Sequence, residues 1–376
     1  MPGRDVGSNV GRPLHELDTP ALLIDTQVLS TNISRTSAIA KEAGARLRPH
    51  IKTHRMLDVA HQQMAAGAQG ICCAKTGEAE VFADGGIDDI FIANQVVGAP
   101  KLRRLQSLAE RVRLAIGVDH PEQVESLHHA FADSRSIDIS IEVDVGQART
   151  GVSDSSSALA LARQILDASG LNLRGIYTHE GHDYNARDAA DLTAIADKAQ
   201  THMLAIAEEV RSATGNSCEV SMGSTPSLLA GVFRDGIDEL RPGTAVFNDG
   251  SHANFLGHTD WCAATVLATI VNQPDPHRVV IDAGAKALTS DQRGPSILEN
   301  IGFGLVVGRP EATIVSLSDE HGVLNVPDAD SYKIGDQLQV IPNHICPCVN
   351  LYDYAYATSD GLITDIWHVS ARGQSQ

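Results

Sequence analysis

The segment around Lys52 combines residue types that could support covalent catalysis. Lys52 lies two residues from both His50 and His54, in a basic stretch that closes an expected strand. On an extended chain alternate side chains share a face, so the three would project together. Cationic neighbours favour the neutral, nucleophilic amine, which suits Schiff-base formation with a carbonyl compound. Taken alone, the segment is explained more simply as a basic loop without chemistry.

A second segment, residues 222–227, has the composition of a phosphate-binding turn. It reads Met-Gly-Ser-Thr-Pro-Ser, and a proline that opens a helix leaves backbone N–H groups available to an anion. We expect Gly223, Ser224 and Thr225 to act together with Gly243 and Thr244, which lie near the following strand. The simpler alternative is that Ser224 or Thr225 only caps the helix, which is common.

Two further polar residues stand at the ends of expected strands. Arg149 lies in a glycine-flanked loop over residues 143–151, from which it could hydrogen-bond a phenolate oxygen of a cofactor. A surface ion pair explains this arginine equally well. His179 could stack on a flat ring, or it could simply be a polar residue that ends a strand.

Late in the chain, His344 and Cys346 have the spacing of a metal-binding pair. Two residues apart on an extended chain, they project to one side, and an imidazole with a thiolate favours zinc. Two ligands do not complete a structural zinc site, but they could hold a catalytic metal that leaves positions for water and substrate. A buried cysteine beside a solvent-facing histidine is the more ordinary explanation of the spacing. Cys348 has the same parity and competes as a ligand.

The elements that must position these residues alternate between strand and helix. Helical periodicity appears, for example, over residues 28–43, 156–168 and 192–213. Eight strands separated by seven helical segments are what a (β/α)8 barrel requires, and the candidate residues follow strands, where barrel active sites lie. A doubly wound open sheet is the competing arrangement. The eight strands are expected at residues 46–50, 70–74, 89–93, 113–118, 138–143, 174–179, 219–222 and 244–247.

After about residue 261 the pattern changes to short β-like runs with little helix. We therefore expect an α/β chain in which a barrel over residues 26–255 precedes a C-terminal β-rich domain. That domain combines residues 1–25 and 256–376 and carries the His344/Cys346 pair. The early strand over residues 21–25 is surplus to the eight. Further strands are expected at 264–271, 279–282, 312–317, 337–341 and 362–369.

Composition limits the possible partners and compartments. A net charge of -18 argues against nucleic acid and anionic membranes as partners. No apolar run approaches the roughly 18 residues of a membrane span, and residues 1–11 show no hydrophobic signal core. Six cysteines in 376 residues do not form a disulfide framework. These features indicate a cytoplasmic protein.

Taken together, the segments resemble the fold-type III pyridoxal-phosphate enzymes, which combine an alanine-racemase-like barrel with a β domain. Within that class the chain is similar to the D-serine dehydratase and D-threonine aldolase family. The resemblance runs from Asp-Thr-Pro at 18–20 through Arg-Pro-His-x-Lys at 48–52 and Gly-Ser-Thr-Pro at 223–226 to His-x-Cys at 344–346. The combination of Arg-Pro-His-x-Lys at 48–52 with His-x-Cys at 344–346 is specific for this family.

The resemblance implies a role for each candidate residue. Lys52 would form the Schiff base with pyridoxal 5'-phosphate (PLP), and Arg241 would face the pyridine nitrogen. Arg149 would contact the phenolic oxygen and His179 the ring face. The phosphate would be held by Gly223, Ser224, Thr225, Gly243 and Thr244. His344 and Cys346 would bind a divalent metal, with zinc as the expected ion and manganese or magnesium as alternatives.

The implied activity is a PLP- and metal-dependent lyase for small-molecule D-β-hydroxy amino acids, in a homodimer. The His-x-Cys motif favours a dehydratase, which would convert D-serine or D-threo-3-hydroxyaspartate to a 2-oxo acid and ammonia. Aldol cleavage of D-threonine or 3-hydroxy-D-aspartate is the alternative, favoured by residues 350–353 and 370–373, with His54 as a candidate base. Racemisation ranks third. A non-catalytic PLP carrier would lack the β domain.

Overall fold

Two units make up the chain in the computed structural model, which describes residues 6–376; the first five residues of the N-terminal stretch considered above lie outside it. The barrel unit comprises Arg35–Lys52, Val59–Gly243 and Gly373–Gln376. The β unit comprises the described residues up to Ser34, with Thr53–Asp58 and Thr244–Arg372. The helices α1 (Thr26–Glu42) and α2 (Leu57–Ala65) each begin in the β unit and end in the barrel unit.

Parallel strands form the centre of the barrel unit, in the order β2-β9-β8-β7-β6-β5-β4-β3. The two ends of this order meet, because His50 pairs in parallel with Cys72 and the Cys72 N–H donates to the Pro49 carbonyl at 2.9 Å. The predicted eight-stranded barrel is therefore confirmed, and an open doubly wound sheet is excluded. The strands are β2 (Arg46–Leu47), β3 (Ile71–Cys73), β4 (Asp89–Gln95), β5 (Arg113–Val118), β6 (Ile137–Glu142), β7 (Leu171–Tyr177), β8 (Glu219–Met222) and β9 (Glu239–Leu240).

The predicted position of the eighth strand is wrong. Residues 244–247 were expected to be extended, but Thr244–Val246 forms the 3-10 helix η5, and the strand is β9 (Glu239–Leu240). Only two residues pair because Pro242 lacks an N–H and cannot continue a ladder. The strand was hidden in the sequence because Glu239, a charged residue, points into the barrel with no exposed surface.

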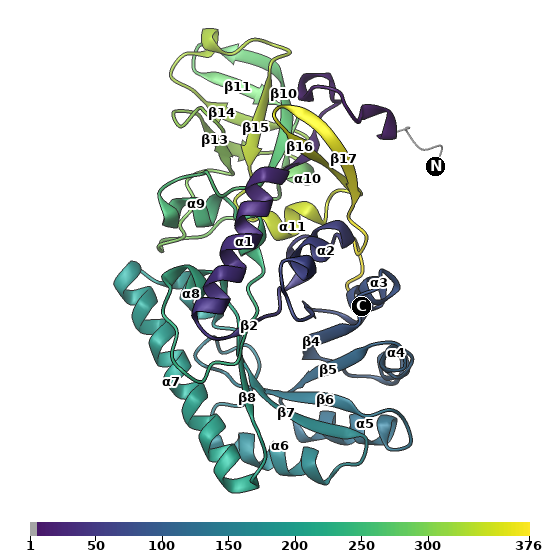
Figure 1. Ribbon diagram of the computed structural model, residues 1–376. Helices are drawn as coiled ribbons and strands as arrows, with labels where there is room; N and C mark the ends of the chain where they lie inside the picture. Colours follow the sequence, from purple (N-terminus) through teal and green to yellow (C-terminus); the bar gives the residue numbers. More distant parts are fainter. Residues whose placement is uncertain (1–5) are drawn as a thin grey trace. The chain divides into compact units, whose positions relative to one another are not determined.

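Helices cover the outside of the barrel strands, as Figure 1 shows for α4, α5, α6 and α7. Their amphipathic patterns explain this, since the buried residues of α6 (Ala158, Leu161, Ala162 and Ile165) recur with helical spacing. The predicted helix over 192–213 belongs to α7 (Ala189–Thr214), which begins at an Asp188 cap and ends at left-handed Gly215. The others are α3 (Thr76–Asp84), α4 (Ala99–Ala109), α5 (Pro121–Phe131), α6 (Ser155–Asp167) and α8 (Thr225–Ala230).

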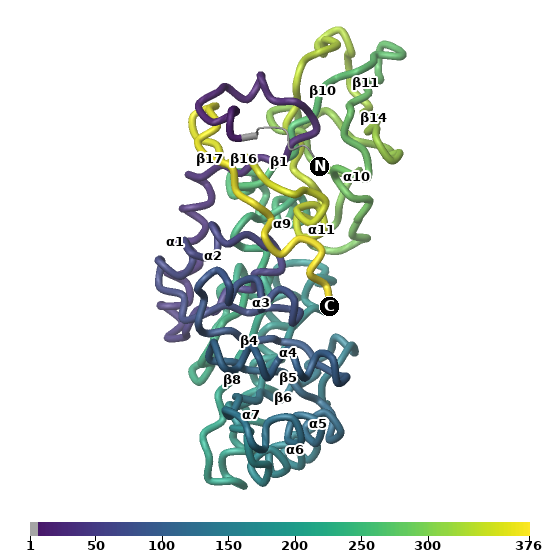
Figure 2. The backbone as a smooth tube through the Cα atoms, turned by 90° about the vertical axis from the view of Figure 1, so that its right-hand side faces the viewer, coloured from purple at the N-terminus to yellow at the C-terminus, as the bar shows by residue number. Residues whose placement is uncertain are grey.

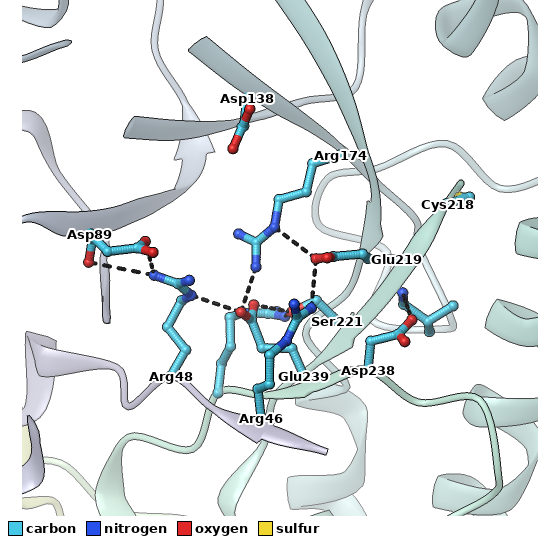
Figure 3. A network of polar contacts seen from close by, with 12 residues as sticks. Arg46, Arg48, Asp89, Asp138, Arg174, Cys218, Glu219, Ser221, Asp238 and Glu239 are labelled. Atoms are coloured by element: carbon cyan, nitrogen blue, oxygen red, sulfur yellow. Dashed lines mark hydrogen bonds and ion pairs between the residues drawn. The ribbon is translucent and has the colours of Figure 1, made fainter. Parts of the chain in front are cut away.

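An ion-pair network fills the barrel at the amino ends of its strands (Figure 3). Glu239 accepts hydrogen bonds from Arg48 Nε at 2.7 Å and Arg174 Nη2 at 2.5 Å. Arg48 also pairs with Asp89 at 2.6 Å, and Arg174 pairs with Glu219 at 3.0 Å. Burial by itself raises the pKa of Glu239, but the charges of Arg48, Arg174 and Arg241 outweigh it and lower the pKa to about 2. The carboxylate therefore remains ionised in the barrel core.

The β unit contains a nine-stranded, mainly antiparallel sheet in the order β11-β14-β13-β12-β15-β10-β1-β16-β17, and β11 also pairs with β10. The early strand β1 (Ala21–Asp25) lies here, antiparallel to β10 and parallel to β16, so the purple strand β1 runs beside the yellow strand β16 (Figure 2). The other strands are β10 (Ala264–Asp275), β11 (Arg278–Ile281), β12 (Leu305–Val306), β13 (Thr313–Leu317), β14 (Gly322–Asn325), β15 (Gln337–Ile341), β16 (Tyr354–Ser359) and β17 (Leu362–His368).

All five strands predicted after residue 261 are present, and β12, β14 and β16 are additional. Three short helices, α9 (Gly250–Leu256), α10 (Ala285–Leu288) and α11 (Ile345–Val349), interrupt the strands. All six cysteines are free, as expected. Over residues 6–376 no helix combines the length and the apolar character that crossing a membrane requires.

Candidate active site and metal centre

Lys52 lies just past the carboxyl end of β2, but it does not lie on an extended chain. Ile51–Thr53 forms the 3-10 helix η3, and the Lys52 N–H donates to Nδ1 of His50 at 3.4 Å. The expectation that His50, Lys52 and His54 share one face of a strand is therefore wrong, because a 3-10 helix has about three residues per turn. The turn nevertheless keeps Lys52 partly exposed at the barrel mouth.

His54 is enclosed within the β unit and has no exposed surface. Its Nδ1 accepts the N–H of Met56 at 3.1 Å, and its ring meets Phe247 edge-on with the centroids 6.3 Å apart. A general base must come within hydrogen-bonding reach of the proton that it removes. The role of His54 as a general base therefore stays a prediction, and the buried position of its ring gives that role no support.

His179 follows β7 and presents an uncharged ring. Its Nδ1–H donates to the carbonyl oxygen of Gly223 at 2.6 Å. Burial, and after it the charge of Lys52, lowers the pKa of His179 to about 3 in spite of this hydrogen bond. The imidazole is thus neutral near pH 7 and lies within the electrostatic reach of the Lys52 amine. A neutral ring fixed at one nitrogen is suited to pack against a flat cofactor.

The loops that follow β8 and β9 lie side by side. The Arg241 N–H donates to the Met222 carbonyl at 2.7 Å, and a Cβ on Gly223 would lie 2.9 Å from the Arg241 carbonyl oxygen. Only glycine allows this approach, since the obstacle includes backbone. Within residues 6–376, the backbone N–H groups of Ser224 and Gly243, both in the barrel unit, are among those for which no hydrogen-bond partner is found. These amides can receive an anion such as a phosphate.

Ser224 also performs the capping role that was the simpler alternative. Its Oγ accepts the N–H of Ser227 at 3.0 Å at the start of α8. The same hydroxyl donates to the carboxylate of Asp183. The Ser224 side chain is therefore already engaged, which leaves its backbone N–H for a phosphate. Thr225 follows in the first turn and is buried.

Two buried carboxylates next to these loops were missed by the sequence reasoning. Glu180 accepts the N–H of Gly223 at 3.0 Å, and Asp183 accepts the Ser227 hydroxyl at 2.8 Å. Burial raises the pKa of both, and with the nearby charge of Glu180 it raises the pKa of Asp183 to about 7. Neither residue has a spacing signal, because their partners lie about forty positions later in the chain.

Arg241 points into the barrel and is 4% exposed. Its Nη2 donates to the Thr178 carbonyl at 2.6 Å, its Nη1 donates to Ser221 Oγ, and its guanidinium lies 5.3 Å from the centre of the Tyr177 ring. Among residues 6–376 no hydrogen-bond partner of Nε is found. Two of its three nitrogens thus hold the side chain in place, and the third is available to a ligand.

Arg149 is half exposed at the carboxyl end of β6, in the predicted loop. Its Nη2 lies 3.7 Å from Oε1 of Glu142, whose other oxygen accepts the Tyr177 hydroxyl at 3.0 Å. Glu142 is buried, so the pair is not the ordinary surface ion pair considered above. One guanidinium nitrogen thus lies near Glu142, and a guanidinium has five N–H donors, so Arg149 can also bind a ligand.

His344 and Cys346 meet in the β unit, although not on an extended chain. His344 precedes α11, and Cys346 lies in its first turn. The predicted extended geometry is therefore wrong, but a hydrogen bond joins the two side chains. Cys346 Sγ also lies 3.3 Å from the hydroxyl of Thr53 and 3.7 Å from that of Thr244. These two threonines are the chain neighbours of Lys52 and Gly243.

Cys348 points away from the other two residues. Its thiol is fully buried and donates to the Ala287 carbonyl at 3.2 Å, and burial raises its pKa far above the ordinary range. Cys348 was considered as a competing ligand because, on an extended chain, it would share a side with His344 and Cys346. Residues 345–349 form the helix α11 instead, so that argument no longer applies. Cys348 therefore has a structural role in this arrangement.

The pair of His344 and Cys346 fits a metal by the chemistry of its donors. Nδ1 of His344 is hydrogen-bonded to Asp291 Oδ2 at 2.8 Å, so a metal would have to bind the other ring nitrogen. Burial alone lowers the pKa of His344, but Cys346, Asp249 and Asp291 together raise it to about 9, so metal binding must release this proton. No set of three histidine, cysteine or carboxylate ligands is found over residues 6–376. A metal held by this pair would therefore take its other ligands from water or substrate.

The residues of the barrel mouth likewise fit PLP. The unpaired amides of the loops after β8 and β9 could bind its phosphate, and the Lys52 amine could react with its aldehyde. The neutral His179 could pack against its flat ring. A closed parallel barrel with such a mouth, continued by an antiparallel β unit, defines the fold-type III class of PLP enzymes.

Comparison with known proteins narrows the class. Residues 24–250 match the family described as "Alanine racemase, N-terminal domain", and residues 263–358 match "Putative serine dehydratase domain". D-threonine aldolase of Arthrobacter sp is 35% identical over 97% of this chain and 96% of its own length. The chain belongs to this family of PLP-dependent lyases, which includes D-threonine aldolases and D-serine dehydratases.

Solved structures agree with this assignment. The crystal structure of D-threonine aldolase from Filomicrobium marinum superposes with a TM-score of 0.87, at 31% identity over the whole of both chains. D-threo-3-hydroxyaspartate dehydratase from Delftia sp. HT23 also gives 0.87, at 32% identity over 95% of this chain and 98% of that one. A Cys-to-Ala variant of D-threo-3-hydroxyaspartate dehydratase has been solved in a metal-free form.

Proposed function

We propose that the chain is a PLP- and divalent-metal-dependent lyase that dehydrates a D-β-hydroxy amino acid to a 2-oxo acid and ammonia. The observation that carries the proposal is the chain connectivity between two donor sets. Thr53, whose hydroxyl lies 3.3 Å from Cys346 Sγ, is bonded directly to Lys52. A metal ligand and the candidate Schiff-base lysine are thereby tied together through one residue.

Within the proposal the barrel residues bind and orient PLP. The amides of Ser224, Gly243 and Thr244 hold the phosphate, supported by Gly223 and Thr225. Arg149 contacts the phenolic oxygen and His179 the ring face. Arg241 would face the pyridine nitrogen, with its Nε available for that contact. These assignments extend the geometry above by resemblance to the family.

The chemistry is divided between the lysine and the metal ligands. PLP, when bound, provides a sink for the electron pair left at the α-carbon. The amine of Lys52 removes the α-proton and holds it. His344 and Cys346 would hold the metal, which as a Lewis acid assists departure of the β-hydroxyl. A fixed positive charge at Arg241 weakens the sink, because it disfavours protonation of the pyridine nitrogen. That increases the need for assistance at the β-carbon.

The nature of the ion, the assembly and the compartment are also proposals. A nitrogen and sulfur donor pair favours zinc over manganese or magnesium. A homodimer is proposed by resemblance alone. The cytoplasm is proposed because all six cysteines are free, as is usual in a reducing compartment.

Aldol cleavage is the second candidate, favoured by the 35% identity to D-threonine aldolase. It uses the same residues, but the Cα–Cβ bond breaks after the β-hydroxyl loses its proton, and glycine and an aldehyde form. His54 was predicted as the base for that proton. Similarity to alanine racemase from Bacillus anthracis, at 14% identity, concerns the fold alone and gives racemisation no further support.

Product analysis tests the proposal. The purified, zinc- and PLP-loaded protein is incubated separately with D-serine, D-threonine and D-threo-3-hydroxyaspartate. Ammonia with a 2-oxo acid supports dehydration; glycine with an aldehyde or glyoxylate establishes the second candidate instead. Lys52→Ala should abolish turnover and the absorption band of the Schiff base with PLP, whereas the control Lys101→Ala on α4 should change neither. His344→Ala should keep PLP bound but stop the lyase reaction.

A further inference from the structure

The chain around the metal-binding pair is fixed at three consecutive residues. Asn343, which is 3% exposed, donates its side-chain N–H to the Asp291 carbonyl at 3.1 Å. The ring of His344 donates from Nδ1 to the Asp291 carboxylate at 2.8 Å. The Ile345 N–H donates to the buried carboxylate of Asp249 at 3.2 Å. The position of His344 is thus fixed by its own hydrogen bond and by those of the residues before and after it.

Asp291 therefore makes a two-point contact, with its backbone oxygen on Asn343 and its side chain on His344. The segment that presents it begins under strain, because Thr289 has a φ of 69°, which a β-branched residue rarely adopts. Such a conformation persists only where the surrounding structure enforces it, and it is concentrated at functional sites. The Asp291 N–H in turn donates to the Thr289 hydroxyl at 3.4 Å. The local fold holds Asp291 against His344 at the cost of backbone strain.

Stability does not account for this arrangement. His344 and Asp291 are 33% and 53% exposed, and an ion pair at such solvated positions contributes little to stability. The contact does, however, determine the chemistry of the ring. With the proton of a neutral imidazole on Nδ1, the lone pair lies on Nε2. Cys346 is hydrogen-bonded to the same ring, so the sulfur donor and the imidazole stay together.

We propose that Asp291 is a positioning residue for the metal centre: it holds His344 in the Nδ1–H tautomer and so directs Nε2 to the metal. The inference rests on the proposed function, because it assumes that His344 and Cys346 bind the ion. A carboxylate on the distal nitrogen of a ligating histidine orients the ring and increases its basicity. Loss of such a partner typically weakens metal binding by about 10- to 100-fold.

The test measures zinc affinity and metal-site spectra of the PLP-loaded, full-length protein. Zinc dissociation constants are obtained by competition with a chelator, and cobalt(II) replaces zinc to give ligand-field and thiolate charge-transfer absorption. Asp291→Ala removes the acceptor, whereas Asp291→Asn keeps an acceptor oxygen without the charge. The matched control is Asp319→Ala, which removes the same charge from a residue that is 80% exposed and pairs with Lys286 at 3.6 Å.

We expect Asp291→Ala to bind zinc about 10- to 100-fold more weakly and to change the cobalt spectrum. Asp291→Asn should retain most of the affinity, and Asp319→Ala should match the wild type. Equal zinc affinity in Asp291→Ala and the wild type would overturn the inference, as would equal losses in Asp291→Ala and Asp319→Ala. His344→Ala separates the two proposals: if it also binds zinc normally, the metal site itself is misassigned, and the proposed function fails with it.

Discussion

Replacing Glu239 by glutamine should destabilise the barrel unit more than any comparable loss of one charge. Glu239 has no exposed surface and lies between Arg48 and Arg174, at 2.7 and 2.5 Å. Glu239→Gln keeps the shape and one acceptor oxygen but leaves two buried guanidinium groups without their shared counter-charge. Removing one partner of a buried ion pair typically costs about 3–5 kcal/mol.

The lowered pKa of Glu239 reflects the same ion pairs and corresponds to a free energy of the same order. The difference between its ordinary value of 4.5 and about 2 in the folded protein corresponds to about 3 kcal/mol. Because the folded pKa lies below the unfolded one, this stabilisation is present above pH 4.5 and is lost as the pH falls toward 2. The wild type should therefore exceed Glu239→Gln by about 3 kcal/mol at pH 7. The difference should shrink progressively between pH 4.5 and 2.

Urea unfolding followed by far-ultraviolet circular dichroism measures this difference, since the helices of the barrel unit dominate that signal. Both tryptophans, Trp261 and Trp367, lie in the β unit, so tryptophan fluorescence measures the unfolding of the β unit separately. The control is Glu219→Gln, because Glu219 is 31% exposed and its pairs with Arg46 and Arg174 are partly solvated. It should cost about 1 kcal/mol or less. If Glu239→Gln is no less stable than this control, the network does not stabilise the barrel and the reasoning is wrong.

Three other changes test the barrel mouth. Ser221→Ala removes the hydroxyl that accepts a hydrogen bond from Nη1 of Arg241. We therefore expect PLP to bind about 10-fold more weakly and its absorption band to shift. The control Ser140→Ala, at an equally buried serine, should have no effect. Gly223→Ala places a Cβ 2.9 Å from the facing backbone and should lower PLP affinity, measured by cofactor titration, without changing the helical circular dichroism. Because the pKa of Asp183 is raised, the stability associated with its protonation is lost as the pH rises from about 4 to 7. The wild type should therefore lose stability relative to Asp183→Asn over that interval in urea unfolding, and parallel curves would refute this.

The parts of the fold that the sequence predicts well are those in which local pattern and burial agree. Strands β5, β8 and β15 occur at the predicted bounds, because each is a short run that contains buried apolar residues and is followed directly by a turn-forming residue. The strand β9 was misplaced by five residues for the opposite reason. Its first residue is a glutamate that only distant arginines can neutralise, and no local pattern reveals them.

Site residues divide in the same way. Lys52, His344 and Cys346 are recognisable because their chemistry is carried by a few adjacent residues. The geometry inferred from parity failed at both places, because η3 and α11 replace the expected extended chain. Side-chain periodicity holds only within an element whose type is already known. Asp183 and Asp291 could not be found from the sequence, since their partners lie more than forty residues away.

The barrel core links stability to the site through a single hydroxyl. Ionic residues at the amino ends of barrel strands usually serve stability, and residues at the carboxyl ends serve chemistry. Here Ser221 Oγ donates to Glu239 at 2.6 Å and accepts a hydrogen bond from Arg241, so it connects the two layers. In the role proposed for Arg241, facing the pyridine nitrogen, the guanidinium must be held in a fixed direction. The network that keeps Glu239 ionised therefore also supplies the negative charge that keeps Arg241 in place, which explains why a barrel core contains so many charges.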